Sequence, residues 1–199
     1  MTMPTTDTPL GLTPGFADPV LGAQGCFRAL LDAMAGPGRP QRIAGLALPP
    51  PPLSAASAAA LLTLADADTP VWTDAGAVAE AWLRFHAGCP LVADPAEAVF
   101  LLVTGTPPRL ATLAQGSEEE PHRSATLLVQ VAGLQEGFGW HLTGPGIEHA
   151  HRLRVEGLQA DFTTQWAANR AGFPRGVDVV LCAGEWLAAL PRTTRIEEG

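Results

Sequence analysis

Two carboxylates and a hydroxyl group lie together where an alanine- and leucine-rich stretch ends. Asp66 and Asp68 are separated by one residue, and Thr69-Pro70 follows them. Paired carboxylates can attack a phosphoryl group and hold a magnesium ion. The other interpretation is that one aspartate accepts hydrogen bonds from turn amides while the other pairs with an arginine.

The first interpretation gives the alternative function, a stand-alone metal-dependent phosphohydrolase using Asp66 and Asp68. The order Asp66-Ala67-Asp68-Thr69 superficially matches the Asp-x-Asp-x-Thr nucleophile loop of haloacid-dehalogenase-type phosphatases. That loop follows a buried strand near the N-terminus, whereas this one ends a helical pattern in the middle of the chain. The lysine that usually balances the charge is absent from the sequence, so an arginine would have to replace it.

Two further groups of residues could bind an anion. Arg84 and His86 end a helical pattern, where either the helix dipole favours a packed histidine or both side chains face phosphate-like oxygens. Arg192 is followed by Thr193 and Thr194, and arginine beside hydroxyls suits oxyanion binding or a bidentate carboxylate clamp.

These charges are attached to apolar segments, and an unpaired buried ion is costly. A clamp of Arg192 onto Asp66 or Asp68 would satisfy both partners. We therefore predict one polar cluster, serving as an anion pocket or contact surface. Its members are Asp66, Asp68, Thr69, Arg84, His86, Arg192, Thr193 and Thr194.

His149 and His151 are two residues apart, so on a strand they would share one face and could bind a metal with Glu148 or His141. The same spacing describes an exposed strand face, and no spacing fixes a third ligand. The role of the two histidines stays open, and we predict neither a metal site nor a catalytic residue.

The composition excludes several classes of protein. The formal net charge of −8 disfavours binding to nucleic acid or an anionic membrane. All 12 basic residues are arginine, and without a lysine a Schiff-base enzyme that uses pyridoxal phosphate is excluded. The three cysteines are far apart and predict reduced thiols. We expect a cytoplasmic protein, because no signal peptide and no apolar run of about 20 residues is present.

The elements that must position these residues follow from the apolar periodicity. Residues 21–35 predict a helix with a core stripe of Phe27, Leu30, Leu31 and Met34. A second helix begins after Ser54 and runs to Thr69-Pro70. A third helix is capped by Asp74 and has a core stripe of Val78, Ala81, Trp82 and Phe85. A fourth helix spans residues 158–171.

The strands are predicted from short apolar runs. They cover residues 91–92, 98–103, 124–134, 177–182 and 186–190, and residues 137–139 are expected to turn the longest run into a hairpin with residues 140–143. Interleaved helices and strands with hairpins predict an α/β three-layer sandwich with a mixed sheet. We expect a flexible arm over residues 1–19 and a single α/β domain over residues 20–199.

Several segments taken together resemble the H subunit of the bacterial carbon–phosphorus lyase core complex. They occur in family order from about residue 20 to residue 196. They are Phe27-Arg28-Ala29-Leu30-Leu31 with Met34, Pro37 and Gly38; Leu62 to Asp66 with Asp68 to Trp72; Leu83 to His86; Ser124 to Leu127; Leu142-Thr143-Gly144 with Gly146-Ile147; Phe173-Pro174 with Gly176-Val177-Asp178; and Pro191 to Thr194.

The resemblance implies a role in phosphonate breakdown. With sister subunits, the family supports the displacement of adenine from ATP by an alkylphosphonate, which gives ribose 1-alkylphosphonate 5-triphosphate. It further implies a fold like the large domain of pyridoxal-phosphate-dependent transferases without the cofactor. The implied partners are a second copy of the chain and the G, I and J subunits, and the implied role is accessory.

Overall fold

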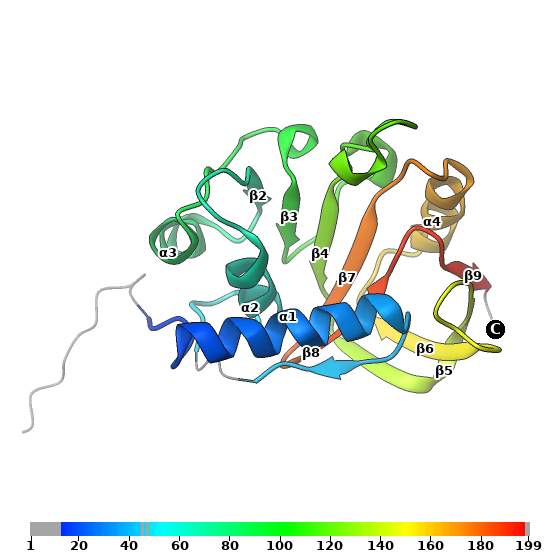
Figure 1. Cartoon of the computed structure of the whole chain (residues 1–199), viewed down its shortest axis with the longest axis horizontal. Coiled ribbons are helices and arrows are strands. Elements are labelled where there is room, and N and C mark those ends of the chain that lie inside the picture. The colour runs from blue at the N-terminus through cyan, green and yellow to red at the C-terminus, as the bar shows by residue number, and fades with distance from the viewer. Residues whose placement is uncertain (1–12, 45, 47, 198–199) are drawn as a thin grey trace, which may run out of the picture.

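A six-stranded mixed sheet forms the centre of the computed structural model, which describes residues 13–44, 46 and 48–197 (Figure 1). Four neighbouring strands are parallel, and two antiparallel strands extend one edge. In spatial order the strands are β1 (Gln41–Arg42), β8 (Trp186–Leu190), β7 (Asp178–Ala183), β4 (Thr126–Gln130), β3 (Phe100–Val103) and β2 (Val71–Thr73).

A second sheet of three antiparallel strands lies beside the first. The long strand β5 (Gly133–Thr143) pairs with β6 (His151–Glu156) on one side and β9 (Arg195–Glu197) on the other. Both sheets contribute to the same core, because Leu142 and Leu153 of the small sheet pack with residues of the large one. The result is a mixed α/β fold, as predicted.

The helices divide between the two faces of the large sheet and complete three layers. Helices α1 (Pro19–Ala35), α2 (Ala55–Leu64) and α3 (Ala77–Ala87) cover one face, and α4 (Phe162–Ala171) lies with the small sheet on the other. Side chains alternate along each strand, so Leu128 joins the first core and Leu127 the second. None of the helices within the described residues is long and apolar enough to cross a membrane.

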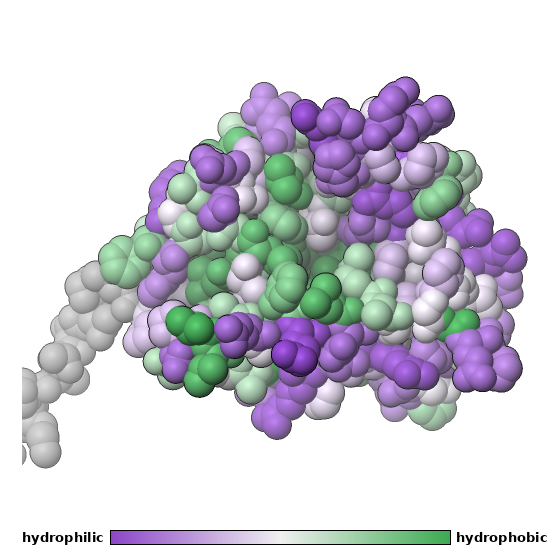
Figure 2. Space-filling view, viewed as in Figure 1, coloured by the Kyte–Doolittle hydropathy of each residue, from purple (hydrophilic) through white to green (hydrophobic). Residues whose placement is uncertain are grey.

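Short 3-10 helices connect the strands at the edge of the large sheet. They are η1 (Pro95–Glu97), η2 (Leu110–Thr112) and η3 (Pro121–Arg123). On the face of the molecule seen in Figure 1, Figure 2 shows apolar residues gathered in the middle, above α1, with polar residues along the top and the lower edge.

The predicted core stripe was wrong at two of its four residues in α1 and at three of its four residues in α3. In α1, Leu30 is buried, but Phe27 and Leu31 are 47% and 53% exposed. In α3, Trp82 is buried while Phe85 is 67% exposed. Both helices contact the alanine-rich helix α2 and bury a face narrower than their apolar stripe. The buried residues are Cys26, Leu30 and Ala33 in α1, and Ala79, Trp82 and Leu83 in α3.

Two predicted helix boundaries also differ. Ser54 caps α2 as expected, accepting a bond from the Ser57 amide at 3.3 Å, but α2 ends at Leu64, before the proline. Asp74 does not cap α3, which begins after Gly76 with φ +83°. Asp74 instead accepts bonds from the Thr104 amide at 2.7 Å and the Gly105 amide at 2.9 Å, which link the ends of β2 and β3.

The predicted central strand over residues 124–134 is confirmed as β4 over residues 126–130, but its C-terminal end and the hairpin were wrong. The chain leaves the large sheet after Gln130, and residues 133–143 form one long strand, β5, in the other sheet. Residues 137–139 are an irregularity within β5, where the pairing with β6 shifts between Glu136 and Trp140. The glycines at 137 and 139 have φ +90° and +75°, which favour a bulge as well as a turn.

The segment before α1 is bound to α3. The Thr13 carbonyl accepts hydrogen bonds from Trp82 Nε1 at 2.8 Å and from His86 Nε2 at 3.0 Å, and Phe16 forms a bridge with Leu46. These contacts fix the approach of the chain to Asp18, which caps α1. Most of the predicted N-terminal arm, residues 1–12, lies outside the described residues.

Candidate functional site

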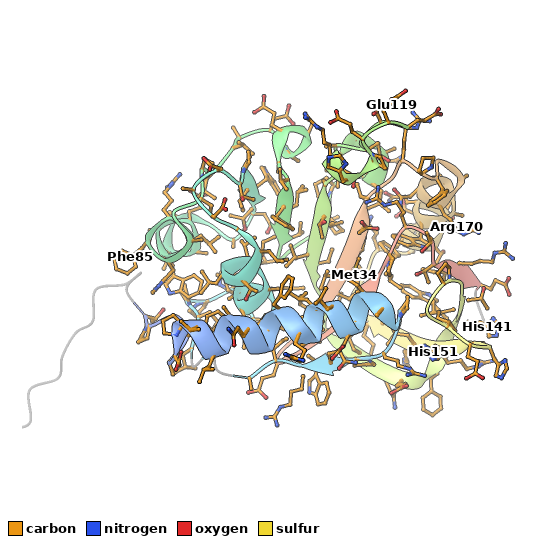
Figure 3. The ribbon with its side chains drawn as sticks, in the orientation of Figure 1. Met34, Phe85, Glu119, His141, His151 and Arg170 are labelled. Carbon is orange, nitrogen blue, oxygen red and sulfur yellow. The ribbon has the colours of Figure 1, made fainter. Side chains whose placement is uncertain are left out.

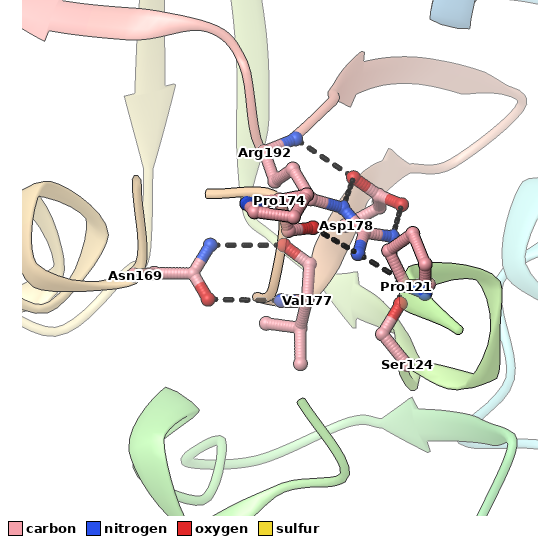
Figure 4. A network of polar contacts seen from close by, with 7 residues as sticks. All are labelled: Pro121, Ser124, Asn169, Pro174, Val177, Asp178 and Arg192. Carbon is pink, nitrogen blue, oxygen red and sulfur yellow. Dashed lines mark hydrogen bonds and ion pairs between the residues drawn. The ribbon is translucent and has the colours of Figure 1, made fainter. Parts of the chain in front are cut away.

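Segments far apart in the sequence meet where β4 and β7 begin (Figure 4). Thr126 and Asp178 are opposite each other at the starts of these parallel strands, and antiparallel β8 returns the chain to the same edge, with Leu190 opposite Val179. Asp178, Ser124 and Arg192 therefore come together, along with the carbonyls of Pro121 and Pro174. We call this set the Arg192 corner.

Arg192 uses every guanidinium N–H group within the chain. Nε donates to Asp178 Oδ1 at 3.1 Å, and Nη2 donates to Asp178 Oδ2 at 2.5 Å and to Ser124 Oγ at 2.6 Å. Nη1 donates to the carbonyls of Pro121 at 2.9 Å and Pro174 at 3.3 Å. Since arginine has five N–H donors, none remains for an added anion. Arg192 thus cross-links residues 121–124 and 174–178 to its own segment. The side chains of Arg192 and Asp178 are only 13% and 16% exposed.

Helix α4 supports this corner through two buried polar side chains. Asn169 accepts from the Val177 amide and donates to the Val177 carbonyl, both at 2.9 Å. Trp166 Nε1 donates to the Thr194 carbonyl at 2.8 Å. Together these bonds tie one helix to the segment before β7 and to the segment after β8, so the position of Arg192 is fixed from both sides.

Two pockets open beside the corner, and both are lined by Thr193 and by Phe173, which is 61% exposed. The first has a volume of about 360 Å³ and lies between the Arg192 corner, His122 and Met34. Figure 3 shows Met34 on the upper side of α1. The second has a volume of about 480 Å³ and is lined by Pro145, Arg170, Ala171, Phe173 and Thr193. Apolar walls with a few polar groups are typical of sites that bind small molecules.

The aspartates proposed as a phosphatase pair lie in an exposed turn. Asp66 Oδ1 accepts bonds from the Asp68 amide at 3.0 Å and the Thr69 hydroxyl at 2.6 Å. The bond from Thr69, with that from the Asp68 amide, lowers the pKa of Asp66 below its usual value. The turn half of the second interpretation is therefore confirmed for Asp66. Its other half was wrong, because no arginine among the described residues forms an ion pair with Asp68.

Arg84 and His86 also find partners close by. Arg84 is 3.7 Å from Glu80, one helical turn earlier, and its side chain is 57% exposed. His86 Nε2 is bonded to the Thr13 carbonyl, and its ring centroid lies 4.8 Å from that of Trp82 and 4.9 Å from that of Phe85. This is the packed interpretation of His86.

The predicted clamp of Arg192 onto Asp66 or Asp68 was wrong in its partner. The carboxylate is Asp178, which the sequence analysis missed. Asp178 lies at the start of an apolar strand, so it too is a charge attached to an apolar segment, which was the reason for selecting Asp66. Of the two following hydroxyls, Thr193 lines both pockets. Thr194 is fully buried, and its Oγ1 has no hydrogen-bond partner among the described residues.

The two histidines with possible metal spacing do not act together. His149 precedes β6, is 89% exposed and lies 3.8 Å from Glu148. His151 is fixed by two bonds, from Nδ1 to the Pro37 carbonyl at 2.9 Å and from Arg39 Nε to Nε2 at 3.0 Å. Across residues 13–44, 46 and 48–197, no group of three or more His, Cys, Asp or Glu residues is placed to hold a metal.

The cysteines are free and buried. Burial raises the pKa of the Cys26, Cys89 and Cys182 thiols. A buried thiol with a raised pKa carries little thiolate and is chemically inert. None of the three is therefore a candidate nucleophile.

Comparison with known proteins gives concordant matches over nearly the whole chain. The family described as "Bacterial phosphonate metabolism protein (PhnH)" matches residues 14–197. The alpha-D-ribose 1-methylphosphonate 5-triphosphate synthase subunit PhnH of Rhizobium meliloti (strain 1021) is 43% identical over 187 residues, covering 92% of this chain and 94% of that protein. The putative C-P lyase subunit protein HtxG of Stutzerimonas stutzeri is 35% identical over 173 residues, covering 87% and 85%.

Proposed function

The chain belongs to the bacterial phosphonate metabolism protein (PhnH) family, and on that premise we propose that it is a subunit of the carbon–phosphorus lyase core complex in organic phosphonate catabolism. It supports the formation of ribose 1-alkylphosphonate 5-triphosphate from ATP and an alkylphosphonate, with release of adenine. The observation that carries the proposal is the 43% identity to a synthase subunit across 92% of this chain.

We propose an accessory role in that synthase, without a catalytic residue of its own. Two features favour this role: the donors of Arg192 are all used within the chain, and Asp66 is bound in a surface turn. The partners we propose are a second copy of the chain and the sister G, I and J subunits, in the cytoplasm, with no nucleic acid and no cofactor.

Two finer expectations stay predictions. One is that the fold is like the large domain of pyridoxal-phosphate-dependent transferases, which superposition on such a domain would test. The other is that the eight residues from Asp66 to Thr194 named above serve an anion pocket or an interface.

Co-expression tests the accessory role. The sister subunits are purified with and without this chain, and formation of the triphosphate product from ATP and methylphosphonate is followed by phosphorus NMR. We expect the assembly containing this chain to release adenine and to lose that activity when the chain is omitted. Full activity of the sister subunits without it would refute the role.

The alternative function, a stand-alone metal-dependent phosphohydrolase, predicts hydrolysis of a phosphorylated compound by the purified chain that Asp66→Asn abolishes. The turn geometry argues against it, because Asp66 Oδ1 is already bonded to Thr69 and Asp68. The family match favours the subunit over this alternative.

A further inference from the structure

Another pocket, of about 410 Å³, lies where α4 contacts η2. None of its lining residues lines the two pockets beside the Arg192 corner. Only Ala111 and Ala168 give it apolar wall, and the other lining residues have charged, amide or hydroxyl side chains. They are Arg109, Gln115, Asp161, Thr164, Gln165 and Asn169. This composition suits a polar ligand.

Two glutamine side chains in the wall are held in place by the chain itself. Gln165 Oε1 accepts from the Leu110 amide, and its Nε2 donates to Asp161 Oδ2, both at 3.0 Å. Gln115 Nε2 donates to the carbonyl groups of Leu110 at 2.7 Å and Leu113 at 2.9 Å. The amide groups are therefore oriented before a ligand arrives, which lowers the entropy cost of binding.

These bonds leave three oxygen acceptors open in the same wall. Gln115 uses both N–H groups of its amide, and its Oε1 has no hydrogen bond among the described residues. Asp161 Oδ1 is likewise unbonded within the described chain, and Gln165 Oε1 has accepted only one bond of the two that an amide oxygen can accept. An ammonium group has three N–H donors, so it matches this set in number and in charge.

Arg109, which directly precedes η2, brings the opposite charge to the pocket. Its side chain is exposed, and its guanidinium group forms no ion pair or hydrogen bond with any residue that the structure describes. Its N–H donors are therefore open to a ligand from solvent. The planar fork of a guanidinium group matches the two oxygens of a carboxylate.

A cation and an anion that line one pocket without pairing to each other narrow the class of ligand. A simple anion would meet Arg109 but be repelled by Asp161, and a simple cation would meet the reverse. A nucleobase normally stacks on an aromatic ring, and none of the lining residues is aromatic. A small molecule that carries both charges satisfies both residues.

We propose that this pocket binds a free α-amino acid, with its carboxylate on Arg109 and its ammonium group on Asp161 and the oxygens of Gln115 and Gln165. The small Ala111 and Ala168 leave room for the side chain of the ligand. Asn169 Nδ2 donates to the Val177 carbonyl and keeps one N–H for a polar side chain such as that of glutamine. The site goes beyond the proposed function and does not rest on it.

Nitrogen-15 NMR titration of the purified chain with L-glutamine, L-alanine, propionate and L-alaninamide tests the proposal. We expect both amino acids to bind saturably at one site, with shifts centred on residues 109–112 and the side-chain amides of Gln115 and Gln165. L-glutamine should bind more tightly, because its side chain can accept from Asn169. Propionate lacks the ammonium group and L-alaninamide lacks the carboxylate, so each should bind at least tenfold more weakly than L-alanine.

Two substitutions separate the charges. Arg109→Ala should weaken L-glutamine at least tenfold, and Arg109→Lys, which keeps the charge without the planar fork, should be intermediate. Asp161→Asn keeps an oxygen for Gln165 but loses the charge, so it should weaken L-alanine at least tenfold and leave propionate as tight or tighter. Arg175→Ala, which removes an exposed arginine outside the pocket, is the matched control and should change the affinities less than twofold.

No saturable shift with either amino acid would overturn the proposal, as would binding unchanged by Arg109→Ala or shifts centred on other residues. Equal affinities for propionate and L-alanine would also overturn it, because they would indicate a site for simple anions. Equal affinities for the two amino acids would support the site without a contact from Asn169. Neither the sister subunits nor a phosphonate enters these titrations, so their outcome is independent of the co-expression test.

Discussion

The Arg192 corner and the α2–α3 end of the molecule contain the same kinds of residue but use them differently. At the corner, Arg192 and Asp178 form a pair whose side chains are 13% and 16% exposed. At the other end, Arg84 and Glu80 are 57% and 35% exposed and only 3.7 Å apart at their nearest atoms. The first pair joins the start of β7 to the segment that follows β8, and the second joins neighbouring turns of one helix. Arginine and carboxylate types do not by themselves reveal which role a residue has.

Burial decides how much each pair contributes. Breaking a buried, fully bonded ion pair leaves an uncompensated charge in a low dielectric. An exposed pair loses only a weak, solvent-screened attraction. The difference between the two regions can therefore be tested by removing one partner at a time.

Arg192→Ala is expected to have the largest effect. It leaves the Asp178 carboxylate with the backbone amide of residue 192 but without its guanidinium partner, and it removes the donors to the Pro121 and Pro174 carbonyls. We therefore expect a loss of roughly 3–5 kcal/mol in the free energy of unfolding. Urea denaturation followed by tryptophan fluorescence measures it. Arg195→Ala, which removes an exposed arginine from β9, is the control. A loss below about 1 kcal/mol would mean that the corner behaves like a surface pair.

Asn169→Ala tests the uncharged part of the same region. It leaves the buried Val177 amide and carbonyl without partners, and each orphaned group costs about 1–3 kcal/mol. The same denaturation experiment applies, with the exposed Thr164→Ala on the same helix as a control. A change no larger than that of the control would show that water replaces Asn169 easily.

Arg84→Ala should matter much less. The pair with Glu80 is exposed and spans one helical turn, so its removal is expected to cost about 0.3–0.5 kcal/mol. Sodium chloride should reduce the difference further, because salt screens exposed charges. A loss of several kcal/mol would instead support the predicted buried cluster at this end.

The smallest effect concerns the turn at Asp66, where the Thr69 hydroxyl contributes most to lowering the pKa of the carboxyl group. A carboxyl group with a lowered pKa in the folded state adds stability above its unfolded pKa, and this stability is lost as the pH falls through the folded value. Thr69→Val should raise the pKa of Asp66 toward its usual value, and Thr69→Ser should not. Carbon-13 NMR titration of the Asp66 carboxyl measures both, and an unchanged pKa in Thr69→Val would contradict the turn geometry.

Local patterns predicted the elements more reliably than their faces. Strands over residues 98–103, 177–182 and 186–190 were confirmed with shifts at their ends, and Ser54 capped its helix. The core stripe of α1 failed because periodicity locates an apolar band but not which edge of it meets the core. Phe27 and Leu31 stay on the outer edge of that band, 47% and 53% exposed. The end of the strand predicted over residues 124–134 was wrong because a continuous apolar pattern does not show where a chain passes from one sheet to another.

The sequence by itself determined the mixed α/β class, the exclusion of Schiff-base chemistry and the family, since these depend on composition, local periodicity and ordered motifs. It also indicated that Arg192 would clamp a carboxylate. Only the tertiary structure chose Asp178, because that choice depends on which strand ends meet at one edge of the sheet. The same holds for Arg170, whose Nε atom is buried without a hydrogen-bond partner among the described residues, because burial depends on the segments that enclose it.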